Sequence, residues 1–167
     1  AKKHDVIIIH DNAYSDLLLN GQTGISFLSV PGAKEVGIEF NSLSKTYNLT
    51  GMRVSFALGN AEVLRAFRAF RSQIDYGMFY PVQAGAVAAL TGPQDIVRRN
   101  REGYMARRDA LCGGLRAIGW DVADAAGTMF VWAKISPHFS SSVAFVMELM
   151  EKTGVICVPG DSFGARG

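Results

Sequence analysis

A run of β-branched residues near the start of the chain, Val6-Ile7-Ile8-Ile9, constrains the fold most. Such residues favour strands, and the run shows no alternation of apolar and polar positions. This pattern predicts a strand that is covered on both faces, as in a parallel sheet. The segment His10-Asp11-Asn12-Ala13-Tyr14 follows directly, so polar side chains are expected at the carboxyl end of the strand.

The remainder of the chain alternates short apolar segments with longer segments of helical periodicity. Further strands are expected over residues 36–40, 54–58, 120–123, 128–135 and 155–158. Helices are expected over residues 60–75, 81–91, 93–117 and 142–152. This alternation predicts an α/β fold. Gly92-Pro93 is the best boundary between a mostly parallel-sheet segment and a smaller α/β unit.

The composition excludes several classes of protein. The chain has 167 residues, of which 49% are hydrophobic and 19% are charged, and this balance excludes a disordered tail. No apolar run approaches the roughly 20 residues that a membrane-spanning helix requires. The 17 Lys and Arg residues nearly balance the 15 Asp and Glu residues, giving a net charge of +2. Such a balance gives no reason to expect nucleic acid or a membrane as a partner.

The cysteines and the chain ends indicate a piece of a cytoplasmic protein. Cys112 and Cys157 are far apart and have no His or Cys cluster beside them, which argues against a disulfide framework and against a metal site. Two reduced thiols in the cytosol are expected instead. The chain starts at Ala1 without an initiator Met and stops after a Gly-rich turn, so we expect an internal fragment of a longer protein.

The polar segment between residues 41 and 53 is the first candidate site. It places two hydroxyls, Ser42 and Ser44, before Lys45, and it places Arg53 eight residues after that lysine. Hydroxyls and a guanidinium suit a phosphate group, and a lysine beside a phosphate could attack a carbonyl carbon. A solvated loop with Lys45 in water is the alternative interpretation.

Asp11 and Tyr14 form the second candidate site. A carboxylate at the end of a buried strand is costly unless a group pairs with it, and a phenol three residues later can reach the same pocket. Taken alone, Asp11 is better explained as a helix or turn cap than as a catalytic group, and His10 is better explained by packing than by catalysis. The two sites follow neighbouring strands, and this favours a functional interpretation of both.

These residues together carry a family resemblance. Asp11-x-x-Tyr14, Ser42-Leu43-Ser44-Lys45 and Arg53 resemble the pyridoxal-phosphate core of the class I/II aminotransferases of fold type I. The resemblance covers the whole chain and implies the C-terminal half of such a protein. Residues 1–91 would be the second half of the large cofactor-binding domain. Residues 92–167 would be the long connecting helix and a small domain truncated at its C-terminal end.

The resemblance implies a role for each site residue. Lys45 would form the internal aldimine with pyridoxal 5'-phosphate and later act as the base at the substrate Cα. Asp11 would keep the pyridine nitrogen protonated, and Tyr14 would donate to the phenolic oxygen of the ring. The phosphate would be held by Ser42, Ser44 and Arg53. Arg166 is not assigned to the substrate carboxylate, because the family's arginine comes further along the chain.

The activity that the resemblance implies is transamination between an amino acid and a 2-oxo acid by a ping-pong mechanism, in a cytoplasmic homodimer. One alternative is a pyridoxal-phosphate-dependent β- or γ-lyase of the same fold, which shares the roles of Asp11, Tyr14 and Lys45. The other is an inactive fragment that serves only as a folding or dimerisation unit. The arginines of the expected helix over residues 93–117 alternate with acidic residues, which indicates a solvated face rather than a nucleic-acid patch.

Overall fold

The computed structural model describes residues 1–164, so Arg166 lies outside the described residues. The chain forms two compact units. The first unit comprises Ala1–Gly113 and Asp124–Val131, and the second comprises Gly114–Ala123 and the residues from Trp132 onward. The expected division of a larger protein at Gly92-Pro93 stays a prediction.

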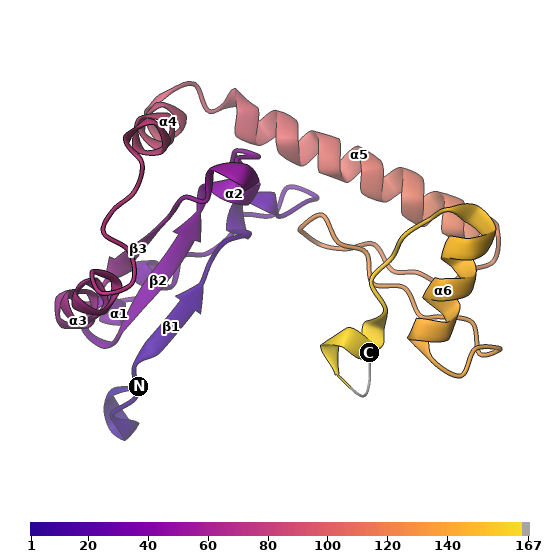
Figure 1. Ribbon diagram of the computed structural model, residues 1–167, viewed down its shortest axis with the longest axis horizontal. Coiled ribbons are helices and arrows are strands. Elements are labelled where there is room, and N and C mark those ends of the chain that lie inside the picture. The colour runs from indigo at the N-terminus through magenta and orange to yellow at the C-terminus, as the bar shows by residue number, and fades with distance from the viewer. Residues whose placement is uncertain (165–167) are drawn as a thin grey trace. The chain divides into compact units, whose positions relative to one another are not determined.

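A mixed three-stranded sheet is the centre of the first unit (Figure 1). Its strands are β1 (Ile8–Asp11), β2 (Gly37–Ser42) and β3 (Ser55–Gly59), in the order β1-β2-β3. β1 and β2 run parallel, and β3 runs antiparallel to β2. The carboxyl ends of β1 and β2 therefore meet the start of β3 at one edge of the sheet.

The strand register brings polar side chains together at that edge. Asp11 pairs with Phe40 across the parallel ladder, and Ser42 pairs with Ser55 across the antiparallel one. Residues that pair directly point to the same face of a sheet, and Phe40 and Ser42 are two positions apart in β2. All four side chains therefore share one face.

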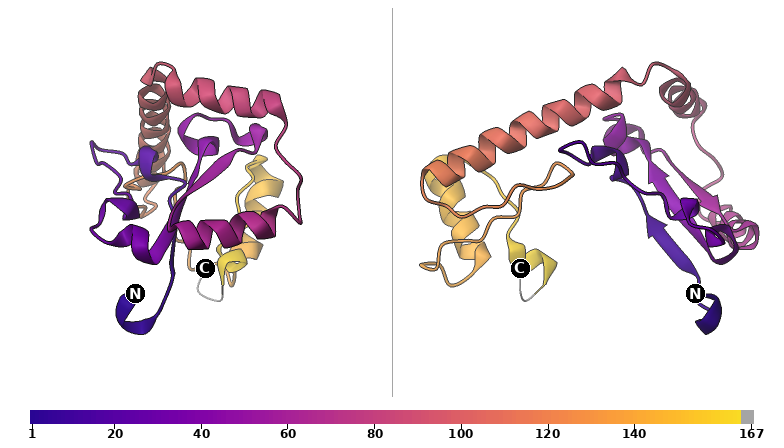
Figure 2. Two further views of the ribbon diagram at one scale, coloured as in Figure 1. Left: turned by 90° about the vertical axis from the view of Figure 1, so that its left-hand side faces the viewer. Right: turned by 180° about the vertical axis from the view of Figure 1, so that it is seen from behind.

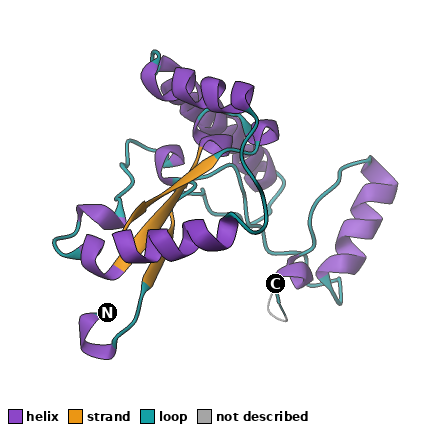
Figure 3. Ribbon diagram, turned by 60° about the vertical axis from the view of Figure 1, so that its left-hand side comes forward, coloured by secondary structure: helices purple, strands orange, loops and turns teal. Residues whose placement is uncertain are grey.

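Helix α3 (Ala61–Arg71) packs on this face and crosses the strands in Figure 3. The edge of the Phe67 ring meets Phe40 at a centroid distance of 5.4 Å. On the opposite face, His10 pairs with Glu39, and Phe27 of the short helix η3 (Phe27–Ser29) packs against His10. Both faces of the sheet thus receive helical segments, which is the layering expected of an α/β protein.

The first strand differs from its expected form. β1 begins two residues after Val6, and Ile9 is 66% exposed. The expectation of a strand covered on both faces is wrong for the described chain. β1 is an edge strand of the sheet, and no other part of residues 1–164 covers Ile9.

The helices of the first unit follow local signals in the sequence. The side chain of Asn60 accepts hydrogen bonds from two backbone amides of the first turn of α3, each at 3.0 Å, as expected of a capping residue. Pro81 lies in the first turn of α4 (Tyr80–Thr91). α5 (Asp95–Ala117) begins after Pro93 and is the longest helix of the described chain. An extended connection over residues 72–79 joins α3 to α4 (Figure 2).

Short helices complete the described secondary structure. The α-helical turns are α1 (Ala33–Val36) and α2 (Leu43–Thr46). The remaining 3-10 turns are η1 (Lys2–His4), η2 (Ser15–Leu17), η4 (Thr50–Met52) and η5 (Gly160–Phe163). α1 occupies Val36, which explains why β2 begins one residue later than expected.

Arg108 of α5 departs from the solvated face expected for this helix. Its side chain is only 8% exposed, and it donates to Asn20 Oδ1 at 3.0 Å and to the carbonyl oxygen of Ala125 at 2.9 Å. Arg108 therefore joins the helix to two loops of the first unit. Arg98 fits the expectation, because it is exposed and lies in ion pairs with neighbouring carboxylates of the same helix.

The second unit contains α6 (Ser142–Thr153), which Ser141 caps and Gly154 ends in a left-handed conformation. The strands expected over 120–123, 128–135 and 155–158 are absent from the described chain. A strand needs a neighbouring strand to pair with, and within residues 1–164 these segments belong to no sheet; one of their contacts is the hydrogen bond from Trp120 Nε1 to the carbonyl oxygen of Lys134. In residues 1–164, no helix has both the length and the apolar character needed to cross a membrane.

Candidate active site

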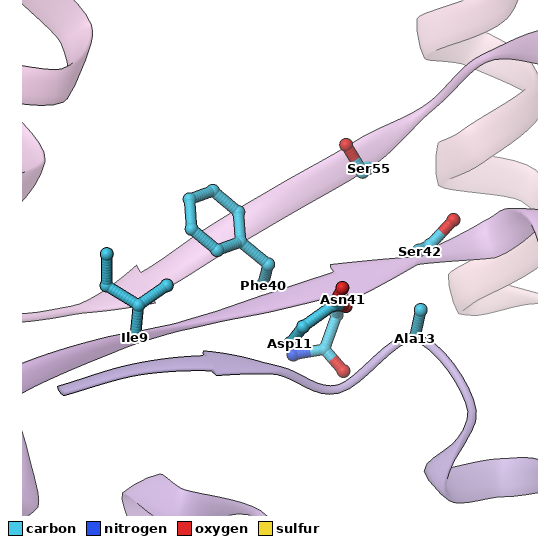
Figure 4. Close-up of a pocket in the computed structure, with 7 residues that line it drawn as sticks. All are labelled: Ile9, Asp11, Ala13, Phe40, Asn41, Ser42 and Ser55. Carbon is cyan, nitrogen blue, oxygen red and sulfur yellow. The ribbon is translucent and has the colours of Figure 1, made fainter. Parts of the chain in front are cut away.

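A pocket of about 340 Å³ opens at the edge of the sheet where β1 and β2 end (Figure 4). Its lining residues are Ile9, Asp11, Ala13, Phe40, Asn41, Ser42 and Ser55. In Figure 4 Ile9 and Phe40 lie toward one end of the pocket, and Ser42, Ser55 and Ala13 lie toward the other. The volume falls within the range of about 300–1,000 Å³ that is usual for small-molecule sites.

Asp11 occupies the last position of β1. The backbone amide of Asn12 donates to the carbonyl oxygen of Phe40 at 2.8 Å, so the ladder continues past Asp11 and fixes its backbone. In the described chain, no hydrogen bond or ion pair engages the Asp11 carboxylate, and it caps no helix. A carboxylate held at a pocket without a partner is available to a cationic group of a ligand.

Tyr14 and Lys45 meet beside this edge. Lys45 Nζ lies 5.9 Å from the centroid of the Tyr14 ring, and both residues are half-buried. Tyr14 comes three residues after Asp11, and Lys45 comes three residues after Ser42 within α2. The lysine amine is thus held against an aromatic face instead of extending freely into water.

The three phosphate candidates occupy different environments. Ser42 lines the pocket, and its Oγ accepts from the Ser44 backbone amide at 3.1 Å, which leaves its hydroxyl hydrogen free to donate. Ser44 is buried inside α2 and does not line the pocket. Arg53 is exposed and also lies outside the lining, and its Nη1 donates to the carbonyl oxygen of Thr50 at 3.0 Å. Arg53 stands two residues before Ser55, which does line the pocket.

Phe130 is a neighbour of the site that the sequence did not single out. Its ring packs edge to face with the Tyr14 ring at a centroid distance of 6.0 Å. Its loop is tied to the segment after Tyr14, because Thr128 N donates to the carbonyl oxygen of Leu17 at 2.8 Å. No local signal could have found this contact, since Phe130 and Tyr14 are distant in the chain.

The conformation of Thr128 also marks this loop. Its φ of 67° lies in the left-handed region, which is a genuine outlier for a β-branched residue. Such conformations persist only where surrounding contacts enforce them, and they cluster at functional sites. The Thr128 hydroxyl accepts from the backbone amide of Phe130 at 3.2 Å, which steadies the turn that presents Phe130.

Glu39 is a second residue that the sequence did not single out, although a charge inside an apolar strand was a usable signal. It is only 2% exposed. Burial raises the pKa of this carboxyl, but hydrogen bonds from Asn12, Asn41, Ser26 and His10 outweigh burial and lower the pKa from 4.5 to about 2. Glu39 is therefore an anion throughout the physiological range.

The chain resembles known proteins along its whole length. The family model for aminotransferase class I and II matches residues 1–167. The LL-diaminopimelate aminotransferase of Dehalococcoides mccartyi is 44% identical over all of this chain and 43% of its own length. The glutamate-pyruvate aminotransferase AlaC of Escherichia coli is 41% identical over all of this chain and 41% of its own length.

Solved structures agree with the sequence matches. The structure of apo-BacF from Bacillus subtilis superposes on the whole chain with a TM-score of 0.91 and 38% identity, and 44% of that chain is covered. The chain thus spans less than half the length of these relatives. These matches confirm the expected α/β fold and the family inferred from the lysine motif. The chain belongs to the class I and II aminotransferases, a family of enzymes that depend on pyridoxal phosphate.

Proposed function

We propose that the complete protein carrying this chain is an aminotransferase, which moves an amino group from an amino acid to a 2-oxo acid in two half-reactions. The observation that carries this function is the pocket shared by Asp11 and Ser42 at one sheet edge, with Tyr14 and Lys45 in contact beside it. A free carboxylate, a hydroxyl donor, a phenol and an amine are thereby gathered from two strand ends.

The side chains present fit pyridoxal phosphate group by group. Asp11 offers a carboxylate for a protonated ring nitrogen, Tyr14 offers a hydroxyl for the phenolic oxygen, and Lys45 offers an amine for the aldehyde. The donors that we assign to the phosphate are Ser42, which lines the pocket, and Ser44 and Arg53, which lie outside its lining. When bound, the cofactor supplies an electron sink for negative charge that develops at the substrate Cα.

Lys45 has two tasks in this function. Its amine would hold the aldehyde of the cofactor, and as a free amine it would move a proton at the substrate Cα. The Tyr14 ring against Nζ limits the positions that the amine can take. A single side chain thus serves as both anchor and base, which is why its removal affects binding and rate together.

Asp11 and the phosphate donors orient the cofactor. The Asp11 carboxylate would favour the protonated form of the ring nitrogen, because an adjacent negative charge stabilises a cation. At the other end of the pocket, the Ser42 hydroxyl has a free hydrogen to donate. The exposed guanidinium of Arg53 has further N–H donors beyond the one bound to Thr50.

The names of the relatives suggest which substrates to test. One is named for LL-diaminopimelate and another for glutamate and pyruvate, at similar identities to this chain. The substrates of the complete protein are therefore an amino acid and a 2-oxo acid, and LL-diaminopimelate and glutamate are the first donors to try. The protein acts in the cytoplasm, where such acids are metabolised.

The complete protein is a homodimer in this proposal. Aromatic side chains are exposed on the connection between α3 and α4 and at the start of α4, including Tyr76, Phe79 and Tyr80. Exposed aromatic side chains are enriched at protein interfaces. Analytical ultracentrifugation of the complete protein tests this assembly, and a sedimentation coefficient of a monomer would contradict it.

The experiment that tests the activity is a pair of half-reactions. The complete protein, loaded with pyridoxal phosphate, is mixed with a donor amino acid and no 2-oxo acid. We expect about one equivalent of the donor's 2-oxo acid per site and no ammonia, followed by full turnover when an acceptor is added. Continuous release of ammonia without an acceptor would indicate a lyase, and no product with any donor would indicate an inactive protein.

A further inference from the structure

We propose that Glu39 is a positioning residue for the cofactor site, which acts from the opposite face of the sheet by holding the ends of β1 and β2 in register. This role rests on the proposed function, because the residues that it positions are those assigned to the cofactor. Glu39 itself does not line the pocket.

The carboxylate of Glu39 gathers side chains from three segments. Asn12 Nδ2 donates to Oε1 at 2.8 Å, and Asn41 Nδ2 donates to the same oxygen at 3.0 Å. Ser26 Oγ donates to Oε2 at 2.7 Å, and His10 Nδ1 lies 3.1 Å from Oε2. A carboxylate has about four lone-pair sites, so these four partners fill its capacity.

On β1, the partners of Glu39 flank Asp11 on both sides. His10 immediately precedes Asp11 and Asn12 immediately follows it, and both side chains reach the same carboxylate. Successive side chains of a strand point to opposite faces, so Asp11 is left to point into the pocket. The two anchors therefore hold the backbone of Asp11 from either side.

On β2, the side chains of Glu39 and Asn41 share one face, and Ser42 lies on the other. Glu39 and Asn41 are two positions apart and bonded to one another, and Ser42 follows directly. Ser42 begins the turn α2 that carries Lys45. The cluster of Glu39, His10, Asn12, Ser26 and Asn41 thus joins the strand end that carries Asp11 to the strand end that leads to Lys45.

A charged cluster of this kind is sensitive to the loss of one partner. A buried carboxylate is tolerated only while it is fully hydrogen-bonded, and each bond to a charged group contributes more than a neutral one. Glu39→Gln keeps the size of the side chain but replaces one acceptor oxygen with a donor. That amide would face either the Nδ2 donors of Asn12 and Asn41, or Ser26 and His10, whose hydroxyl and ring nitrogen can also accept. In either orientation the cluster loses the negative charge to which all four partners are now bonded.

Binding of the cofactor to the complete protein tests this role. The variants are Glu39→Gln and, as a matched control, Glu62→Gln, which changes an exposed glutamate on α3. The readouts are the affinity for pyridoxal phosphate by equilibrium titration, the pH midpoint of the visible absorbance of the bound cofactor, and the melting temperature. We expect Glu39→Gln to weaken affinity about tenfold or more, since small misplacements of a binding group have effects of this order. We also expect it to displace the pH midpoint in the direction that Asp11→Asn displaces it.

A purely structural role would give a different pattern. If Glu39→Gln lowers the melting temperature but leaves affinity and pH midpoint as in Glu62→Gln, the positioning role is overturned. If Glu39→Gln does not fold, Asn12→Ala removes a single donor from the cluster, and the same readouts then decide. Failure of the wild-type protein to bind pyridoxal phosphate would instead contradict the proposed function, so the two failures are distinguishable.

Discussion

Lys45 Nζ lies 5.9 Å from the centroid of the Tyr14 ring, and the Phe130 ring packs edge to face with the same ring at a centroid distance of 6.0 Å. The three residues come from the turn α2, from the segment after β1 and from the loop at residues 124–131. Tyr14 therefore neighbours both the amine and a second aromatic ring. We expect the position of the Tyr14 hydroxyl to depend on Phe130.

Phe130→Ala in the complete protein should lower kcat/KM for the amino donor about fivefold. An aromatic pair contributes about 1 kcal/mol, which corresponds to a factor of this size. Phe130 is 60% exposed, so the change should have little effect on the melting temperature. Phe70→Ala on α3 is the matched control, since Phe70 is 64% exposed and its ring pairs with no other ring of the described chain. Equal kinetics for both variants would show that Phe130 does not support Tyr14.

Asp11→Asn should leave the cofactor attached through Lys45 but reduce the rate of amino transfer about a hundredfold or more. The amide is uncharged and does not stabilise a protonated ring nitrogen, and loss of such a preorganised electrostatic contact typically has this magnitude. Stopped-flow measurement of the first half-reaction gives the rate directly. Asp5→Asn, which changes an exposed aspartate before β1, should behave as wild type. Undiminished rates in Asp11→Asn would remove Asp11 from the mechanism.

The low pKa of Glu39 predicts a loss of stability in acid. Its value of about 2 in the folded chain lies below the ordinary 4.5, so the stabilisation is complete above pH 4.5 and disappears as the pH falls toward 2. The difference corresponds to about 3 kcal/mol. Lowering the pH from 5 to 2 should therefore reduce the free energy of unfolding of the wild type by about 3 kcal/mol more than that of Glu39→Gln. Urea unfolding at each pH measures this difference. Parallel curves for the two proteins would contradict the assigned pKa.

Arg108→Met should destabilise the protein by about 2 kcal/mol, because it removes the hydrogen bonds that the buried guanidinium donates to Asn20 Oδ1 and to the carbonyl oxygen of Ala125. Arg99→Met, at an exposed position of the same helix, should change stability by no more than about 0.5 kcal/mol. Chemical denaturation of both variants makes the comparison. A small effect at Arg108 would mean that water replaces the lost donor.

Features that depend on neighbouring residues could be predicted from the sequence. Asn60 and Pro81 set the starts of two helices through local hydrogen bonding and a fixed φ. The lysine motif identified the family, because its spacing carries the cofactor chemistry within one short segment. Asp11 was placed correctly at the end of the first strand for the same local reason.

Features that depend on distant residues could not be predicted. The strands expected over 120–123, 128–135 and 155–158 had a suitable composition, but a strand forms only where a neighbouring strand pairs with it. Helical periodicity placed Arg108 on a helix, yet its burial depends on Asn20 and Ala125. The partners of Glu39 likewise come from β1 and from Ser26, so only the sheet register reveals that cluster.

The most direct test is to identify the lysine that carries the cofactor. The complete protein is loaded with pyridoxal phosphate, reduced with borohydride and digested, and the labelled peptide is located by mass spectrometry. We expect the pyridoxyl group on Lys45, no label and no amino transfer in Lys45→Ala, and wild-type behaviour in Lys34→Ala, which changes an exposed lysine of α1. A label on any other lysine, or amino transfer that survives in Lys45→Ala, would contradict the central role given to Lys45.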